Sequence, residues 1–243
     1  MNRRAFALAL LLPLLCGAIF PGDDDHQGRQ EDQKRLAPYA GLVGPWKGTG
    51  QVRRGSAQGA WRESAAWEWK LAPESAALIL KIDDGKYLKS LMLTPADAAG
   101  EFVVDAVLTD GTHRTFTGKS AASDVLALAC TDENAVGLAK ITLKPLHETR
   151  FLLLLEGKKR ENDRLTRFGE VGFTRQGVSF AAGESYPLCI VTEGRGTIRV
   201  QHQGKSYFVC CDGCRELFES DPDAVIAEAK KRAEKQAQDK AAK

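Results

Sequence analysis

The feature that most constrains the fold is a series of short β-like segments between residues 46 and 173. Turn signals such as Asp84-Gly85, Asp110-Gly111 and Glu156-Gly157 interrupt the series. Some segments alternate apolar and polar residues, whereas 151–155 is apolar throughout and is typical of a strand buried on both faces. The segments are 46–53, 61–71, 77–82, 87–93, 101–108, 114–119, 125–130, 138–143, 150–155 and 165–173.

Strands at this spacing predict an antiparallel sandwich or barrel over residues 42–176. We favour a closed barrel of about ten strands, because closure removes exposed edges and this region contains no helix-like pattern to cover an open sheet. The fold class is therefore mainly β. A small cysteine-containing module over residues 186–222 follows the barrel, and then a helical tail over 223–243, which Asp221 is expected to cap and which is expected to be solvated.

The stretch Gly44-Pro45-Trp46-Lys47-Gly48-Thr49-Gly50 opens the barrel region. It resembles the glycine–tryptophan start of lipocalin-like and nitrobindin-like barrels. That resemblance implies a tryptophan at one end of the barrel, and either a packing role for Trp46 or a lumen for a small apolar ligand. Haem would need an axial ligand, and neither His113 nor His147 lies in a haem motif, so haem is not predicted.

The amino-terminal segment has the pattern of an export signal. Arg3 and Arg4 precede an apolar run over residues 5–20, which is short for a membrane span of about 20 residues and typical of a secretory signal. We expect residues 1–18 to be cleaved, the protein to be periplasmic or secreted, and no integral membrane span to remain. Lipoprotein anchoring at Cys16 is disfavoured, because Leu15 occupies a position that needs a small residue.

Two further properties narrow the class of protein. The formal net charge of +2 is too small to indicate a nucleic-acid partner, and the scattered histidines form no catalytic motif, so a non-enzyme is expected. Residues 19–41 are rich in polar and charged side chains and are predicted to be a flexible linker.

Cysteines cluster near the carboxyl end. Twenty residues separate Cys189 from Cys210, and three separate Cys210 from Cys214, with Cys211 between them. Strand-like residues on either side of Gln203-Gly204 predict a hairpin that returns Cys210 to the level of Cys189. The Cys211–Cys214 spacing is that of a zinc knuckle, with Gly213 supplying a left-handed backbone. A unit this small needs a metal or disulfides for stability.

Residues 186–225, from Tyr186-Pro187-Leu188-Cys189 through Cys210-Cys211-Asp212-Gly213-Cys214 to an Asp-Pro, resemble the TRASH/YHS family of metal-binding modules. The resemblance implies a treble-clef-like zinc, copper or other heavy-metal site on Cys189, Cys210 and Cys214. Ile190 stands where the family often has proline. Members occur in metal sensors, transporters and their accessory proteins, so a metal-handling partner protein is implied as well.

Three thiolates leave one position of a four-ligand zinc site to be filled. Cys211, His202 and water are the candidates, and His202 could equally be an exposed histidine. The alternative for the whole cluster is a disulfide, for instance between Cys189 and Cys210 or Cys214, because export implies an oxidising compartment. Cys130, alone in a strand, is expected to be a buried apolar residue.

Overall fold

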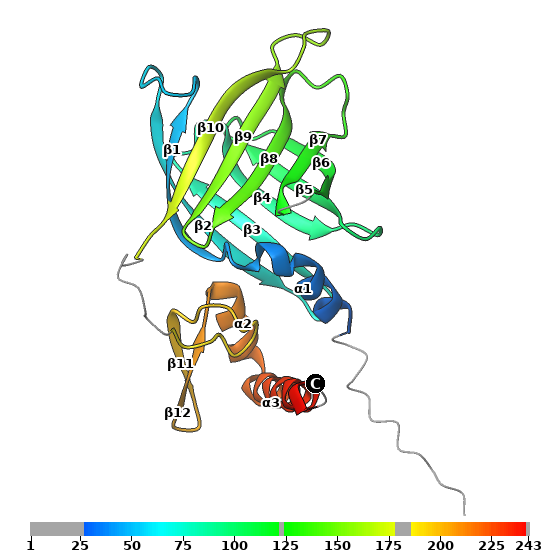
Figure 1. Cartoon of the computed structure of the whole chain (residues 1–243), viewed down its shortest axis with the longest axis vertical. Helices are drawn as coiled ribbons and strands as arrows, with labels where there is room; N and C mark the ends of the chain where they lie inside the picture. Colours follow the sequence, from blue (N-terminus) through cyan, green and yellow to red (C-terminus); the bar gives the residue numbers. More distant parts are fainter. Residues whose placement is uncertain (1–26, 122–123, 178–185, 242–243) are drawn as a thin grey trace, which may run out of the picture.

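A computed structural model of the chain describes residues 27–121, 124–177 and 186–241. Ten antiparallel strands close into a barrel, and a small module with a two-stranded sheet and two helices lies beneath it (Figure 1). The elements are α1 (Gln27–Ala40), β1 (Gly44–Gln51), β2 (Trp61–Leu71), β3 (Ala76–Asp83), β4 (Leu88–Pro95), β5 (Glu101–Leu108), β6 (His113–Ser120), β7 (Leu126–Cys130), β8 (Gly137–His147), β9 (Arg150–Lys158), β10 (Thr166–Arg175), β11 (Ile198–His202), β12 (Lys205–Val209), α2 (Asp212–Ser220) and α3 (Pro222–Ala241).

Each barrel strand pairs with its sequence neighbours, and β1 pairs with β10 to close the sheet, so the predicted ten-stranded barrel is confirmed. The turns at Asp84-Gly85 and Asp110-Gly111 lie between strands as predicted. The turn predicted at Glu156-Gly157 is wrong, because both residues lie inside β9. Gly157 is needed there because a Cβ would overlap the carbonyl oxygen of Gly137 on β8.

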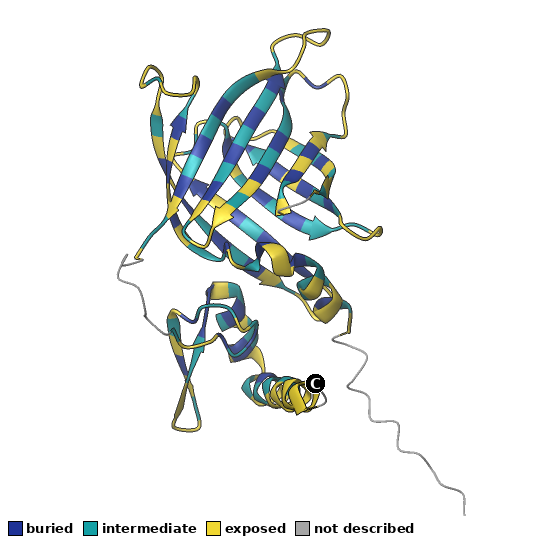
Figure 2. Ribbon diagram, viewed as in Figure 1, coloured by how far each residue is buried: buried dark blue, intermediate teal, exposed yellow. Residues whose placement is uncertain are grey.

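Aromatic rings pack against one another at one end of the barrel interior. Trp46 is fully buried, lies edge-on to Phe151 at 4.8 Å between ring centroids, and donates its indole N–H to the Leu42 carbonyl at 2.7 Å. Phe151 in turn stacks on Phe173 at 4.4 Å. Buried and exposed residues alternate along the strands (Figure 2). Trp46 is therefore a packing residue of the barrel end.

The linker predicted over residues 19–41 is wrong for the part that the structure describes. Residues 27–40 form α1, which lies across one end of the barrel (Figure 1). Tyr39 meets Phe102 edge-on at 5.4 Å and donates its hydroxyl hydrogen to Ser120 at 3.0 Å, while the Asp32 carboxylate accepts the Ala76 amide at 3.0 Å. Few apolar residues suffice here, because Leu36 and Tyr39 are buried completely.

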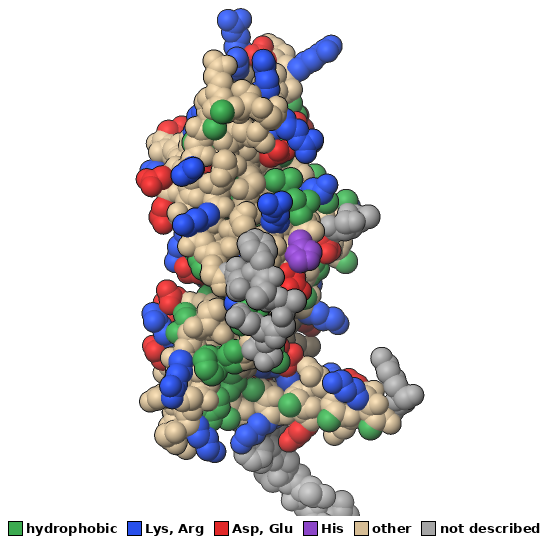
Figure 3. Space-filling view, turned by 60° about the vertical axis from the view of Figure 1, so that its left-hand side comes forward, with side chains coloured by type: hydrophobic (Ala, Val, Ile, Leu, Met, Phe, Trp, Pro, Cys, Tyr) green, Lys and Arg blue, Asp and Glu red, His purple; other side chains and the backbone are tan. Residues whose placement is uncertain are grey.

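The signal peptide predicted over residues 1–18 and its cleavage site lie outside the described residues. None of the helices within the described ranges is long and apolar enough to cross a bilayer. Acidic and basic side chains are interspersed along the face drawn in Figure 3, as the small net charge of +2 leads one to expect.

Candidate metal centre

The module is built on the hairpin that the sequence predicts. Strands β11 and β12 pair from Ile198–Val209 to His202–Lys205, and Gln203 and Gly204 both have positive φ, as a two-residue type I′ turn requires. The loop that carries Cys189 is fixed to this hairpin, because the Ile190 amide donates to the Phe208 carbonyl at 2.9 Å. The hairpin thus brings Cys189 beside the end of β12, where Cys210 follows.

Cys211 and Cys214 lie at the start of α2 and not in a separate knuckle turn. Cys211 is the N-cap residue in extended conformation, and Asp212 begins the helix. Phe218 on the same helix packs against Tyr207 of β12, with 5.5 Å between the ring centroids. The amphipathic helix therefore holds Cys214 against the hairpin through its buried face.

The sulfurs of Cys189, Cys210 and Cys214 all lie within 4.8 Å of one another. The Cys210–Cys214 distance is 3.5 Å, far beyond a disulfide bond of about 2.05 Å. Four thiolates at zinc–sulfur distances of about 2.3 Å in a tetrahedron are about 3.8 Å apart. The three side chains are buried, with at most 6% of each residue exposed. The three sulfurs are therefore close enough together to hold one metal ion, and all three thiols are free.

The hydrogen bonds and charges within the thiol group shift the pKa values of its members, and these shifts explain why a cation would stabilise it. Hydrogen bonds from Cys210 and Cys214 lower the pKa of Cys189, so that this thiol ionises first. The resulting hydrogen bonds and charge at Cys189 raise the pKa values of Cys210 and Cys214, and burial raises them further. Three thiolates in one buried site are unstable alone, and a bound metal ion would compensate their charge.

Cys211 lies beside this group and hydrogen-bonds two of its members, Cys210 and Cys214, although its sulfur is not among the three that lie within 4.8 Å of one another. Its sulfur is 3.8 Å from that of Cys210 and accepts the backbone amide of Trp69, in β2 of the barrel, at 3.3 Å. Strand β1 pairs with β2 only as far as Trp67, whereas β3 pairs with it up to Leu71. The end of β2 therefore has a free edge, and the amino-terminal end of α2 covers it.

Gly213 explains how closely the helix approaches that edge. A Cβ at this position would overlap the carbonyl oxygen of Trp69. The sequence interpretation, a left-handed turn, is wrong, because Gly213 lies in α2 and its φ is not positive. The glycine is needed for close approach of two backbones, which no local sequence signal specifies.

His202, the other candidate for a fourth ligand, is directed elsewhere. Its Nε2 atom lies 3.0 Å from the Asp223 carboxylate, and its ring meets Phe218 edge-on. It does not belong to the group of cysteine sulfurs. Cys130, half-buried in β7, is a free thiol of the barrel.

Helix α3 supports the cysteine loop from outside. Asp221 caps it as predicted, accepting the Ala224 amide at 3.0 Å, and Arg232 donates to the Ile190 carbonyl at 2.6 Å. The first half of this helix also reaches the barrel side of the molecule, where Glu228 pairs with the buried Arg29 of α1 at 3.2 Å. The expectation of a purely solvated tail is thus wrong for this half.

Comparison with models of protein families finds no match to this chain, and comparison with curated proteins finds none either. The assignment of the site therefore depends on its geometry.

Proposed function

We propose that this chain is an exported metal-binding protein that holds one zinc or copper(I) ion through Cys189, Cys210 and Cys214, and that it acts as a sensor, buffer or accessory in metal handling. The observation that carries the proposal is the convergence of three buried sulfurs within 4.8 Å. Thiolate ligands suit both zinc and copper(I). The resemblance of residues 186–225 to TRASH/YHS modules points to the same class of site.

A binding role is proposed in preference to catalysis. The thiols are almost completely enclosed, whereas a catalytic cysteine is partly exposed to its substrate. A cavity lies between the module and the barrel, and of the three cysteines only Cys210 borders it. This position gives a metal ion a path for exchange. A metal-handling partner protein would be the natural recipient, and the exported location remains an expectation from residues 1–18.

Elemental analysis of the full chain tests the proposal. We expect about one equivalent of zinc or copper per chain, and none in a Cys210→Ser/Cys214→Ser variant. Substituting Co²⁺ would give a sulfur-to-cobalt charge-transfer band in the wild type and not in the variant. Cys130→Ser is the matched control, since this thiol lies in the barrel.

The proposal fails if the wild type binds no metal after reduction of its thiols. It also fails if the double variant binds metal as well as the wild type does. Protein with all four module thiols oxidised in the native compartment would favour the disulfide alternative.

A further inference from the structure

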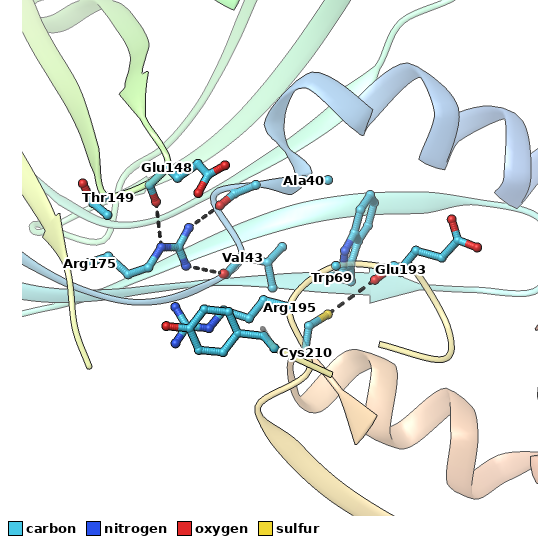
Figure 4. Close-up of a pocket in the computed structure, with 13 residues that line it drawn as sticks. Ala40, Val43, Trp69, Glu148, Thr149, Arg175, Glu193, Arg195 and Cys210 are labelled. Carbon is cyan, nitrogen blue, oxygen red and sulfur yellow. Dashed lines mark hydrogen bonds between the residues drawn. The ribbon is translucent and has the colours of Figure 1, made fainter. Parts of the chain in front are cut away.

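A cavity of about 460 Å³ lies between the end of the barrel and the module, directly beside Cys210 (Figure 4). Its volume is in the range of small-molecule sites. Arg175, at the end of β10, and Arg195, in the loop after Cys189, face it from opposite regions of the chain. Two guanidinium groups therefore face one cavity, and this cavity borders the thiol cluster on the side of Cys210.

Arg175 is a fixed positive charge in this cavity. Its guanidinium lies over the Trp46 ring at 4.2 Å and donates to the backbone carbonyls of Glu148 and Val43 at 2.8 Å each, and also to that of Gly41. Burial, and then the charge of Arg195, lower the pKa of Arg175 to about 10. The group therefore remains protonated at neutral pH, although it has only neutral hydrogen-bond partners.

The guanidinium group of Arg195 has an N–H group that is available to a ligand. It stacks on the ring of Tyr186 at 3.2 Å, and its buried Nε atom has no hydrogen-bond partner. Within the described parts of the chain, no carboxylate forms an ion pair with Arg195 or Arg175. Of the acidic residues that line the cavity, Glu193 is engaged by Arg232 and Gln236, and Glu148 offsets part of the charge of Arg175.

We propose that this cavity binds a small thiol that carries a carboxylate, with the carboxylate on Arg195 and the sulfur toward Cys210. Two like charges facing one cavity favour an anion, and a guanidinium group matches a carboxylate in geometry. The ligand's sulfur suits the remaining position of a metal held by three thiolates. This inference rests on the proposed function, and it identifies the form in which the metal reaches the site.

The exchange balances without any change of oxidation state. The metal enters as a complex with the small thiolate. Each new bond from the metal to a protein sulfur would displace one water ligand of the metal, each protein sulfur that still carries a proton would release it to water, and the small thiolate would first remain as the fourth ligand. When its bond to the metal breaks, the small thiolate takes up a proton from water and leaves.

The test uses the full chain loaded with Co²⁺ under anaerobic conditions, with 3-mercaptopropionate and 2-mercaptoethanol as probes. Both carry one thiol, and only the first carries a carboxylate. We expect 3-mercaptopropionate to change the cobalt spectrum at a concentration at least about tenfold lower than 2-mercaptoethanol does. A hydrogen bond between charged groups increases affinity by about this factor or more. Propionate should compete with it without adding a charge-transfer band.

Arg195→Gln should remove the preference for the carboxylate, and Arg199→Gln is the matched control, since Arg199 lies on β11 and donates to Ser206. Equal potency of the two thiols in the wild type, or an unchanged preference in Arg195→Gln, would overturn the inference and leave metal binding intact. Absence of any sulfur-to-cobalt band would instead refute the proposed function and this inference with it. The presence or absence of the sulfur-to-cobalt band therefore distinguishes failure of this inference from failure of the proposed function.

Discussion

The barrel and the module are stabilised in different ways. The barrel closes ten strands on a large apolar interior, with Trp46, Trp67, Phe151 and Phe173 fully or almost fully buried. The module has a two-stranded sheet and two helices, and its buried side chains include all four of its cysteines. A unit of this size buries too little apolar surface to be stable alone. In the module, the buried thiols therefore take the place of part of an apolar core.

The largest effect that would test this difference is expected from Trp46→Ala. Removing a fully buried indole should lower the barrel's free energy of unfolding by about 3–5 kcal/mol, measured by urea denaturation followed by circular dichroism. Metal content should stay unchanged. Val52→Ala, at an exposed position, is the control, and we expect a change within about 0.5 kcal/mol. Loss of metal together with barrel stability would contradict the separation of the two regions.

Metal removal should have the converse effect. At free metal concentrations of 100 to 1,000 times Kd, binding stabilises the folded module by about 2.7–4 kcal/mol, and a chelator removes this. Hydrogen exchange should then accelerate for the amides of β11 and β12, whereas the amide of Leu153 in β9 should be unaffected. Equal acceleration in both regions would show that the barrel also depends on the metal.

Gly213→Ala addresses the junction of the two regions. Its Cβ would overlap the Trp69 carbonyl oxygen, so either α2 or β2 must shift, at a cost of about 1–3 kcal/mol. The Trp69 amide resonance should move as its hydrogen bond to Cys211 lengthens, while metal stoichiometry stays the same. Gly172→Ala is the control, because a Cβ there meets only Leu152, at an ordinary 3.5 Å. An unmoved Trp69 resonance in Gly213→Ala would argue against the docking seen here.

The smallest effect is expected from His202→Ala. This imidazole pairs with Asp223 at 3.0 Å and lies outside the sulfur group, so metal affinity should not change in a competition titration with a chromophoric chelator. A loss of about tenfold or more, the size that follows removal of groups supporting a metal site, would show that His202 participates in the site.

The sequence predicted the barrel well because the information is local. Alternating and apolar runs specify strands, and every run between residues 46 and 173 became one. Helix α1 was missed because its sequence is mostly polar and contains Pro38. Its stability comes from the burial of Leu36 and Tyr39, and the partners of Tyr39, Phe102 and Ser120, lie far along the chain.

The same division holds within the candidate site. The predicted hairpin brought Cys210 to Cys189, and the resemblance to TRASH/YHS modules implied Cys214 as the third member of the group that the structure shows. Spacing could not tell which of Cys210 and Cys211 would join the sulfur group, since adjacent residues differ only in the direction in which their side chains point. The tertiary structure distinguishes their surroundings, because the Trp69 amide of β2 donates to Cys211, whereas the Cys210 sulfur groups with those of Cys189 and Cys214.

By itself, then, the amino-acid sequence determined a closed β-barrel, a cysteine hairpin and a capped final helix, each of which depends on neighbouring residues and short turns. The tertiary structure alone decided that α1 covers the barrel end, that Gly213 allows α2 to dock on β2, and that Arg175 and Arg195 face one cavity beside Cys210. The physical reason is that these features are contacts between backbones and charges far apart in the chain, and local residue patterns do not encode them.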